Sequence, residues 1–479
     1  MVRGSSASGS HCGGLSAQAT APGGRAHPGT TGLVVGFVHD LTFADLPAPV
    51  VEQAQQRLLD LLGVAAGGVH TPASVATRNH AARYFAAHAG GARMLFDGRR
   101  VSPVGAALAG GMTIDSLDGH DGYPLAKGHA GAAVLPSLLA LVDAGADAAG
   151  PELLTALVVG YEIALRAGIA LHATAADYHS SGAWNALGCA AVGARLLRIG
   201  EVETRHALGI ADYHGPRSPM MRCIDHPTMV KDGSGWGAMA GTSAALLAAD
   251  GFTGAPAPVV ERADDLVRPL WEDLGTRWRT LEQYFKPYPV CRWAHPAIDA
   301  ALALRRRWAI DSEAAITGAE IVTFHQAVRL ATRRPRTTEE AQYSLPFTVA
   351  AALARGVVGA REVAAEALRD AAILQLSDAI TIRESASYEA RASTSEEYHA
   401  QVTLQLADGR QLVEESTSRK GDPATPLTDQ ELIDKFHSLS RQSLGQARRD
   451  RIQTETSTLA HGGDPARLLN DTLAPADPA

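Results

Sequence analysis

Residues suited to acid–base chemistry or metal binding are concentrated in one short stretch, DSLDGHDGYPLAKGHAGAAVLP, at positions 115–136. It holds three aspartates, two histidines and one lysine ahead of an apolar run. The side chains that a metal could use here are Asp115, Asp118, His120, Asp121 and His129. Their spacing matches no HExxH sequence, EF-hand loop or pair of thiolates, so we predict no bound metal. The alternative to an acid–base site is a polar loop in which Asp115 or Asp118 caps the following helix.

Three other turns place a basic side chain next to the start of an expected helix. His179 lies in DYHSSGAWNALG and Lys231 in HPTMVKDGSGWGAMAG, while FKPYPVCRWAHPAIDAAL contains Lys286, Cys291 and His295. The free N–H groups at a helix start favour anions, so these turns together predict a pocket for carboxylates. The stretch KDGSGWG is neither a Walker loop nor a dinucleotide fingerprint, and we therefore predict no nucleotide cofactor.

The elements that must position these residues are mainly helical. Apolar residues at helical spacing predict helices over 47–68, 132–146, 151–171, 182–200, 237–251, 345–358 and, near the C-terminus, 428–452. Strands are expected at 319–325, at 379–385 and over 400–412, where alternating Val402, Leu404 and Leu406 precede an Asp408–Gly409 turn. A mixed α/β segment thus follows a long all-helical one.

The bulk composition excludes several classes of protein. A chain of 479 residues with 46% hydrophobic and 20% charged residues is globular and long enough for two domains. The net charge of −8 argues against a nucleic-acid partner or an anionic membrane surface. The four cysteines lie far apart, and no run of about 18 apolar residues suggests a transmembrane helix. The Gly- and Ser-rich residues 1–32 read as a flexible tail without a secretory signal, so we expect a cytoplasmic protein.

Several segments, in order along most of the chain, resemble the MmgE/PrpD family. The specific ones are KPYPVCRWAHPAIDAAL and EAQYSLPFTVAAALARG, supported by HAGAAVLPSLLAL, GYEIALRAG, YHSSGAWNALGCAAVGARLLRIG and GDPATPLTDQEL. The resemblance covers about residues 33–450. It implies a large helical domain with a smaller α/β lid domain inserted between its N- and C-terminal parts. We therefore expect a flexible tail (1–32), a helical domain (33–283), an α/β lid (284–415) and returning C-terminal helices with a short tail (416–479).

The resemblance also implies an activity: acid–base chemistry on a small di- or tricarboxylate, without metal or cofactor, in a cleft between the domains of a homodimer. The family positions fall on Asp115, His129, His179 and Lys231, which we expect to be catalytic, and on Lys286, Cys291 and His295, which we expect to bind substrate. Basic side chains would neutralise the substrate carboxylate before a proton is removed next to it. Crowding of these cations would lower their pKa values and provide a neutral base near pH 7.

One segment departs from the pattern of the family's dehydratases, which read Asp–Asp–Thr ahead of a nearby His-Pro-Gly. This chain reads DGHDGYPLAKGHAG, which adds His120, Asp121 and Lys127 to the expected rim of the pocket, with His120 as a further substrate-binding candidate. The first hypothesis is a lyase that dehydrates a 2-methylcitrate-like acid. The alternatives are a decarboxylase of the cis-aconitate type, an epimerase of the iminodisuccinate type and a non-catalytic carboxylate-binding protein. In the epimerase, Lys231 and Tyr123 or Tyr178 would act on opposite faces of the substrate.

Overall fold

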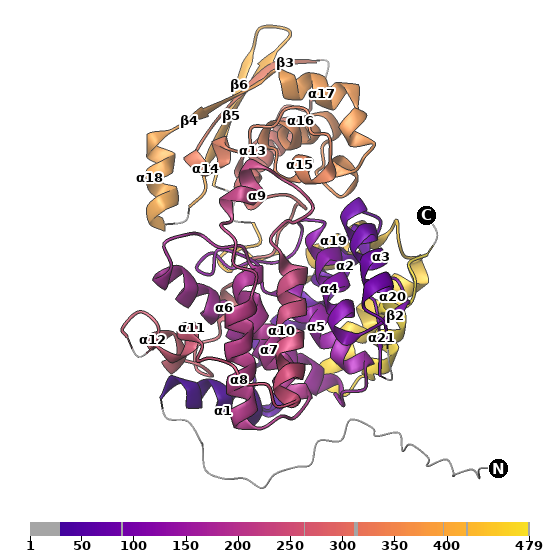
Figure 1. Cartoon of the computed structure of the whole chain (residues 1–479). Helices are drawn as coiled ribbons and strands as arrows, with labels where there is room; N and C mark the ends of the chain where they lie inside the picture. The colour runs from indigo at the N-terminus through magenta and orange to yellow at the C-terminus, as the bar shows by residue number, and fades with distance from the viewer. Residues whose placement is uncertain are drawn as a thin grey trace, which may run out of the picture.

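The computed structural model describes residues 29–87, 90–262, 264–310, 315–395, 397–417 and 420–477. It has a helical part and a smaller part built around a sheet, drawn one above the other in Figure 1. The fold class predicted from the sequence, a mainly helical protein with a smaller α/β part, is confirmed. Of the predicted tail, residues 1–28 lie outside the described residues, and the first helix begins at Thr30. The predicted domain boundaries stay predictions.

The helical part is formed by the first half of the chain. Its helices are α1 (Thr30–Asp40), α2 (Ala48–Gly68), α3 (Pro72–Tyr84), α4 (Pro103–Asp115), α5 (Gly131–Asp143), α6 (Gly150–Thr174), α7 (Gly182–Leu196), α8 (Glu201–His214), α9 (Met221–Asp225), α10 (Ser234–Ala249), α11 (Pro258–Glu261) and α12 (Pro269–Glu272). A two-stranded antiparallel ribbon, β1 (Ala92–Arg93) and β2 (Arg100–Val101), lies beside α4. The helices expected at 47–68, 132–146, 151–171, 182–200 and 237–251 are confirmed with ends shifted by a few residues.

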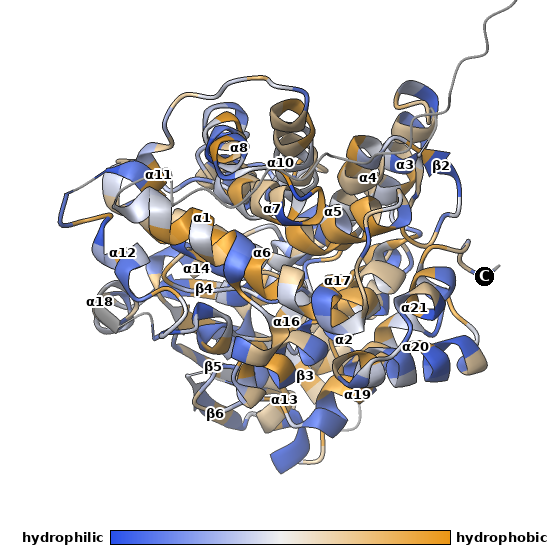
Figure 2. Cartoon of the chain, turned by 90° about the horizontal axis from the view of Figure 1, so that it is seen from below, coloured by the Kyte–Doolittle hydropathy of each residue, from blue (hydrophilic) through white to orange (hydrophobic). Residues whose placement is uncertain are grey.

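The core of this part is built on α6, which packs against α7. A side chain on Gly188 of α7 would have its Cβ 2.4 Å from the carbonyl oxygen of Gly160 on α6, so only glycine allows this close approach. By length and composition α6 is apolar enough to cross a membrane. However, 94% of the 18-residue segment that meets this criterion is buried inside the protein. Figure 2 shows the hydrophobic residues of α5, α6 and α7 gathered in the middle of the molecule. The helix is therefore apolar because it is a core helix.

The C-terminal helices return to the first helices of the chain. They are α19 (Asp429–Ser440), α20 (Gln446–Thr458) and α21 (Pro465–Thr472), and Figure 1 shows them in yellow beside α2. The helix predicted over 428–452 is two helices, because the chain turns at Gly445, the N-cap of α20. Thr428 starts α19 in a capping box with Glu431. The two ends of the sequence thus share one helical core.

The smaller part contains a four-stranded sheet of order β4-β3-β5-β6. Its strands are β3 (Ile316–Thr323), β4 (Ile380–Glu384), β5 (Ala400–Leu406) and β6 (Gln411–Ser416), and its helices are α13 (His295–Arg307), α14 (His325–Val328), α15 (Thr338–Gln342), α16 (Leu345–Arg355), α17 (Ala371–Asp378) and α18 (Ala386–Ser395). β3 pairs parallel with β4 and antiparallel with β5, which forms a hairpin with β6. Val402, Leu404 and Leu406 are buried as their alternation predicted. The range 400–412 holds two strands because the chain reverses at Gly409, whose φ is 87°.

Candidate active site

A cavity of about 480 Å³ lies between the helical part and the sheet part. The loops after α4 and α6 and the segment before α13 form one side of its wall, and α14 and α18 form the other. The ionisable side chains on the wall are Asp118, Tyr123, Lys127, His129, Tyr178, Asp232, Tyr284, Lys286, Cys291, Arg292, His325, Arg329, Tyr343 and Tyr398. Such a concave site with converging polar groups is the usual location of an active site.

The loop between α4 and α5, which the sequence singled out, is anchored at two buried aspartates. Asp115, the last residue of α4, accepts a hydrogen bond of 3.0 Å from the backbone N–H of Ser234 at the start of α10. Asp121 pairs with Arg57 at 3.1 Å and accepts a hydrogen bond of 2.6 Å from the Tyr161 hydroxyl. Both aspartates lie behind the cavity wall. Asp121, expected at the rim, instead fixes the loop to α2 and α6.

Asp118 and Lys286 form a buried ion pair on the wall. Nζ of Lys286 lies 2.6 Å from Oδ1 of Asp118 and 3.2 Å from its backbone carbonyl oxygen. Burial alone would raise the pKa of Asp118, but Lys286, Lys231, His120 and His129 outweigh it and hold that pKa well below its usual range. Asp118 is therefore a carboxylate at neutral pH. An ammonium group has three N–H donors, so Lys286 keeps one donor beyond the two used by Asp118.

His120 and His129 lie against each other, with ring centroids 4.4 Å apart. Burial, with a further contribution from Lys286, lowers the pKa of each to about 3, so both imidazoles are neutral at pH 7. Nδ1 of His129 is hydrogen-bonded to the carbonyl oxygen of Asp121, and a carbonyl can only accept. The proton of His129 therefore resides on Nδ1, and the lone pair of Nε2 faces Asp232 at 3.6 Å. Only His129 of the two lies on the wall; His120, expected at the rim, is fully buried behind it.

Asp232 lies on the wall, and the sequence motifs did not predict a role for it. Oδ2 of Asp232 accepts a hydrogen bond of 3.0 Å from Ser181, whose Oγ also accepts from the backbone N–H of His129. Oδ1 of Asp232 has no hydrogen-bond partner in the described chain. Burial raises the pKa of Asp232, and Asp115 and Asp118 add to this effect. A raised pKa and a free oxygen suit a carboxyl group that exchanges protons. The feature of the sequence that could have pointed to Asp232 is its position next to Lys231 in the Gly-rich turn.

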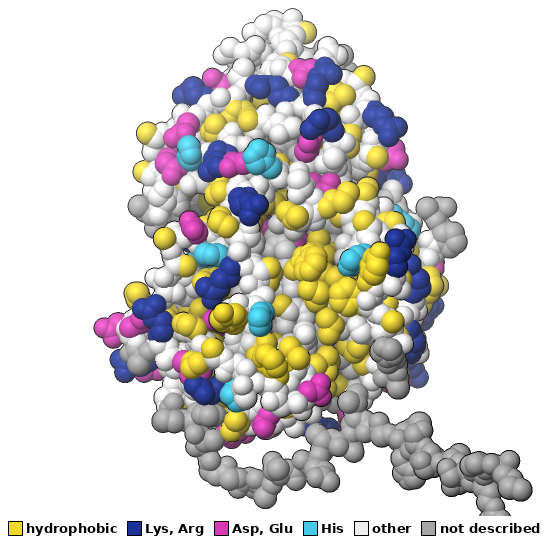
Figure 3. Space-filling view, in the orientation of Figure 1, with side chains coloured by type: hydrophobic (Ala, Val, Ile, Leu, Met, Phe, Trp, Pro, Cys, Tyr) yellow, Lys and Arg dark blue, Asp and Glu magenta, His cyan; other side chains and the backbone are white. Residues whose placement is uncertain are grey.

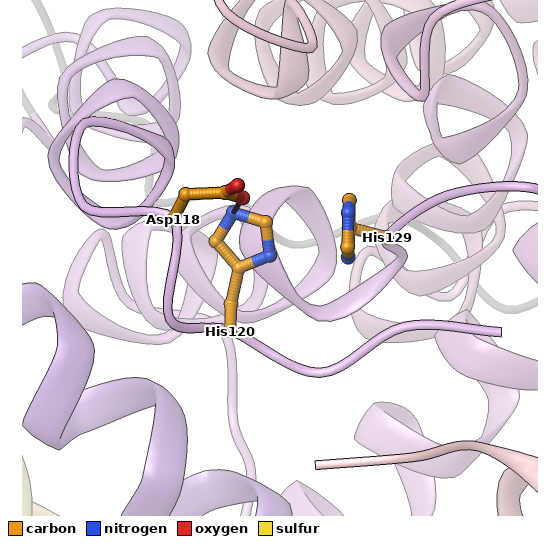
Figure 4. Close-up of side chains that lie close together, drawn as sticks. All are labelled: Asp118, His120 and His129. Carbon is orange, nitrogen blue, oxygen red and sulfur yellow. Dashed lines mark ion pairs between the residues drawn. The ribbon is translucent and has the colours of Figure 1, made fainter. Parts of the chain in front are cut away.

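Three residues of this group could hold a metal ion. One ligand atom each from Asp118, His120 and His129 lie within 4.8 Å of one another, and Figure 4 shows the three side chains around one space. Two neutral imidazoles and a carboxylate are a suitable donor set for a divalent transition metal. The ammonium group of Lys286 already lies 2.6 Å from Oδ1 of Asp118, however, and it would repel a dication bound to the same carboxylate. The geometry fits an ion pair better than a resident metal.

Lys231 is buried one layer behind the cavity. Its Nζ donates a hydrogen bond of 2.7 Å to Oε1 of Gln342 and lies 4.5 Å from the ring centroid of Tyr343, which is on the wall. Oε1 of Gln342 also accepts from the backbone N–H of Asp118. Lys231 has a φ of 47°, a left-handed conformation that is rare outside glycine. Gln342 and Tyr343 belong to the segment AQYSLPF, to which no role was assigned. That segment brings the start of α16 to the site.

The segment before α13 supplies both wall residues and a buried support. Cys291 lies on the wall, and burial raises the pKa of its thiol to about 12, so it is not a thiolate nucleophile at neutral pH. His295, the first residue of α13, is fully buried behind the wall, with Nε2 3.1 Å from the carbonyl oxygen of Val290. Arg292, which had no predicted role, lies on the wall between Asp422 and the Tyr284 ring.

His179 lies outside the group of side chains that converge on the cavity. It is half-buried, with Nδ1 2.7 Å from the carbonyl oxygen of Asp177 and its backbone N–H bonded to His172. Of the eight predicted site residues, the structure brings His129, Lys286 and Cys291 to the wall. It places Asp115, His120, Lys231 and His295 directly behind the wall or in its support.

Two domains of one known protein family match this chain, one in its N-terminal region and one in its C-terminal region. The MmgE/PrpD N-terminal domain matches residues 34–275, and the MmgE/PrpD C-terminal domain matches residues 288–460. The chain belongs to the MmgE/PrpD family. The resemblance inferred from the sequence is confirmed, and the cavity lies where the matched N-terminal and C-terminal regions meet.

Several MmgE/PrpD relatives carry the name of one reaction. The chain is 26% identical to the cis-aconitate decarboxylase-like protein oryM of Aspergillus oryzae, over 92% of this chain and 96% of the relative. It is 25% identical to the cis-aconitate decarboxylase of Aspergillus terreus over 59% of this chain and 61% of the relative. With the mouse cis-aconitate decarboxylase it shares 24% identity over 84% of this chain and 85% of the relative. These names support a lyase.

Proposed function

We propose that this protein is a metal-independent acid–base lyase that acts on a small di- or tricarboxylate. The observation that carries the proposal is the His129–Asp232 pair on the same cavity wall as Lys286. An enzyme of this kind needs a cation that neutralises the substrate carboxylate, next to a group that moves a proton. A protein of net charge −8 must supply that cation locally.

Lys286 is the group that meets the reacting carboxylate. Two contacts of its ammonium group go to Asp118, and its third N–H is available to an anion in the cavity. The buried setting strengthens this interaction relative to the same contact in water. Lys231 acts through other residues, because it contacts Gln342 and the Tyr343 ring and does not line the cavity. We assign it a positioning role.

His129 and Asp232 are the groups that transfer protons to and from the substrate. In a dehydration, Nε2 of His129 takes a proton from carbon, and protonated Asp232 gives a proton to the departing hydroxyl group. In a decarboxylation, the carbon–carbon bond breaks, CO₂ leaves, and the electron pair left on the substrate is protonated by the same pair. Both reactions use a neutral imidazole and a carboxyl group of raised pKa, which the burial of the site favours.

Decarboxylation of a cis-aconitate-like acid is the reaction that the names of the relatives favour, and dehydration of a 2-methylcitrate-like acid is the second candidate. Epimerisation has less support. The pair proposed for it was Lys231 with Tyr123 or Tyr178, but Lys231 does not reach the cavity. Burial also raises the pKa values of both tyrosines, which makes either one a poor base near pH 7.

The test is incubation of the pure protein with cis-aconitate, 2-methylcitrate, citrate and iminodisuccinate in D₂O, followed by proton NMR. Loss of CO₂, loss of water, and deuterium exchange with inversion are distinct outcomes. We expect one of the first two, with incorporation of deuterium when CO₂ is lost. Inversion without bond cleavage would identify an epimerase. A protein that binds these acids and changes none of them would contradict the proposal.

A further inference from the structure

The basic side chains on the cavity wall differ in whether they have a carboxylate partner, and the proposed reaction does not explain this difference. Six of them line the cavity, and five have a carboxylate partner in the described chain. The pairs are His129 with Asp232, Lys286 with Asp118, Arg292 with Asp422, His325 with Glu384, and Arg329 with Asp225. Lys127 is the sixth, and its ammonium group forms no ion pair with any described residue.

Lys127 is held at the mouth of the cavity by a tight turn. Tyr123 and Gly128 close this turn through a backbone hydrogen bond of 2.9 Å, and the N–H of Lys127 donates to the carbonyl of Pro124. Directly before the turn, Gly122 pairs with Tyr284 through two backbone hydrogen bonds. The turn is therefore fixed to the segment that carries Lys286. The exposed side chain of Lys127 has its Nζ 6.0 Å from the ring centroid of Tyr178, another wall residue.

Two further observations separate Lys127 from an ordinary solvated lysine. Its φ is 52°, so the backbone is in the left-handed region that costs a lysine about 1 kcal/mol. Five non-glycine residues in the described chain have positive φ, and Lys127 and Lys231 are two of them. Lysine is also scarce here: the chain has five lysines against 38 arginines, and Lys127, Lys231 and Lys286 are three of the five. Strained residues cluster at functional sites.

We propose that Lys127 binds a second carboxylate of the substrate at the mouth of the cavity, while Lys286 binds the first one inside it. A di- or tricarboxylate, the substrate class already proposed, uses both lysines, and a monocarboxylate leaves Lys127 unused. This inference rests on the proposed function. It adds that the chain selects polycarboxylates through a residue in the segment where its sequence departs from the dehydratase pattern. Because Lys127 is exposed, its contribution should weaken as salt rises.

The experiment is isothermal titration calorimetry at low ionic strength, with succinate, glutarate and tricarballylate as the polycarboxylate probes and butyrate as the monocarboxylate probe. The test variant is Lys127→Asn, since asparagine accepts a left-handed backbone and removes the charge without harming the turn. Lys127→Arg keeps the charge. Lys420→Asn is the matched control, because Lys420 is an exposed lysine that pairs with Glu431 and does not line the cavity.

We expect the wild type to bind at least one polycarboxylate about tenfold more tightly than butyrate, which corresponds to about 1.4 kcal/mol. Lys127→Asn should abolish this difference and leave the affinity for butyrate unchanged. Lys127→Arg and Lys420→Asn should behave like the wild type. If Lys127→Asn binds the polycarboxylates as tightly as the wild type does, the inference is wrong and the proposed function stands. If the wild type binds none of the four acids, both fail.

Discussion

The ammonium group of Lys286 lies 2.6 Å from Oδ1 of Asp118, and this pair joins the segment before α13 to the loop between α4 and α5. The two side chains are 1% and 4% exposed. Removal of one partner from a buried pair leaves the other charged and unpaired, which destabilises a protein by about 3–5 kcal/mol. The pair therefore links stability to the chemistry proposed for the cavity.

Lys286→Ala should lower kcat/KM by roughly 10²–10⁴, the range for loss of an acid–base or charge-stabilising group, and should also lower stability. The double variant Lys286→Ala with Asp118→Asn should recover stability without activity, because the unpaired charge is gone and the cation is still missing. Urea unfolding and steady-state kinetics on both variants separate the two effects. An active double variant would remove Lys286 from the mechanism.

Cys291→Ser should retain most of the turnover. Cys291 lies on the cavity wall, but its pKa of about 12 leaves it almost entirely as a thiol at pH 7. Steady-state kinetics on the variant and treatment of the wild type with iodoacetamide at pH 7 are the measurements. Inactivation of the variant, together with a covalent substrate adduct in the mass spectrum of the wild type, would instead identify Cys291 as a nucleophile.

EDTA should leave activity unchanged. Lys286 holds the Asp118 carboxylate that a metal bound with His120 and His129 would need. Added Zn²⁺ should bind weakly at most, and any inhibition should be competitive with substrate, because the ion and the substrate would use the same groups. Metal analysis after dialysis and kinetics with and without EDTA test this. Activity lost to EDTA and restored by one divalent ion would show that the reaction needs a metal.

Stability should fall as pH decreases from 7 to 5. His120 and His129 have folded pKa values of about 3 against an ordinary 6.5, so their contribution is present above pH 6.5 and is lost toward pH 3. Asp115 has the opposite effect on stability. Burial raises its pKa to about 6, so protonation of its carboxylate as the pH falls stabilises the folded protein. Near pH 5, unfolding takes up about two protons at His120 and His129 together and releases about one at Asp115, so these three groups contribute a slope of about 1.4 kcal/mol per pH unit.

His120→Asn is the matched variant for this pH dependence. It should reduce the slope of unfolding free energy against pH by about one proton, or about 1.4 kcal/mol per unit. Urea unfolding of both proteins at several pH values, with EDTA present throughout, gives the two slopes. Identical slopes would mean that His120 is protonated in the folded protein.

We expect a homodimer that uses the outer face of α10. Trp236 and Leu247 are 48% and 38% exposed on this helix, and Met229, Val230 and Phe252 extend the apolar surface at its two ends. Figure 3 shows hydrophobic side chains gathered over the front of the helical part, the face on which Figure 1 draws α10. Trp236→Asp should give a monomer in light scattering, and Tyr213→Asp on α8 is the control. A monomeric wild type would refute the expectation.

The sequence was enough to predict several of the long helices, the strands and the family, because these depend on local pattern. Apolar spacing was enough to place α2, α5, α6, α7 and α10, and the alternation in β5 was enough to place its buried face. The turns that hold Lys231 and Lys286 were recognisable from their Gly- and Pro-rich setting. Family membership followed from motifs such as KPYPVC and AQYSLPF.

Only the tertiary structure decided which of these polar residues face the cavity. Asp118 and Lys286 are 168 positions apart in the chain, and the partner of Lys231, Gln342, is 111 positions away. The same turn composition describes Lys286 on the wall, Lys231 behind it and His179 outside it. A side chain's role in this site depends on burial and on partners that come from distant segments, and local sequence encodes neither. Hence the sequence predicted most of the candidate acid–base residues as a group but not Asp232, while the packing of α10, α15 and the α4–α5 loop decided where each side chain lies.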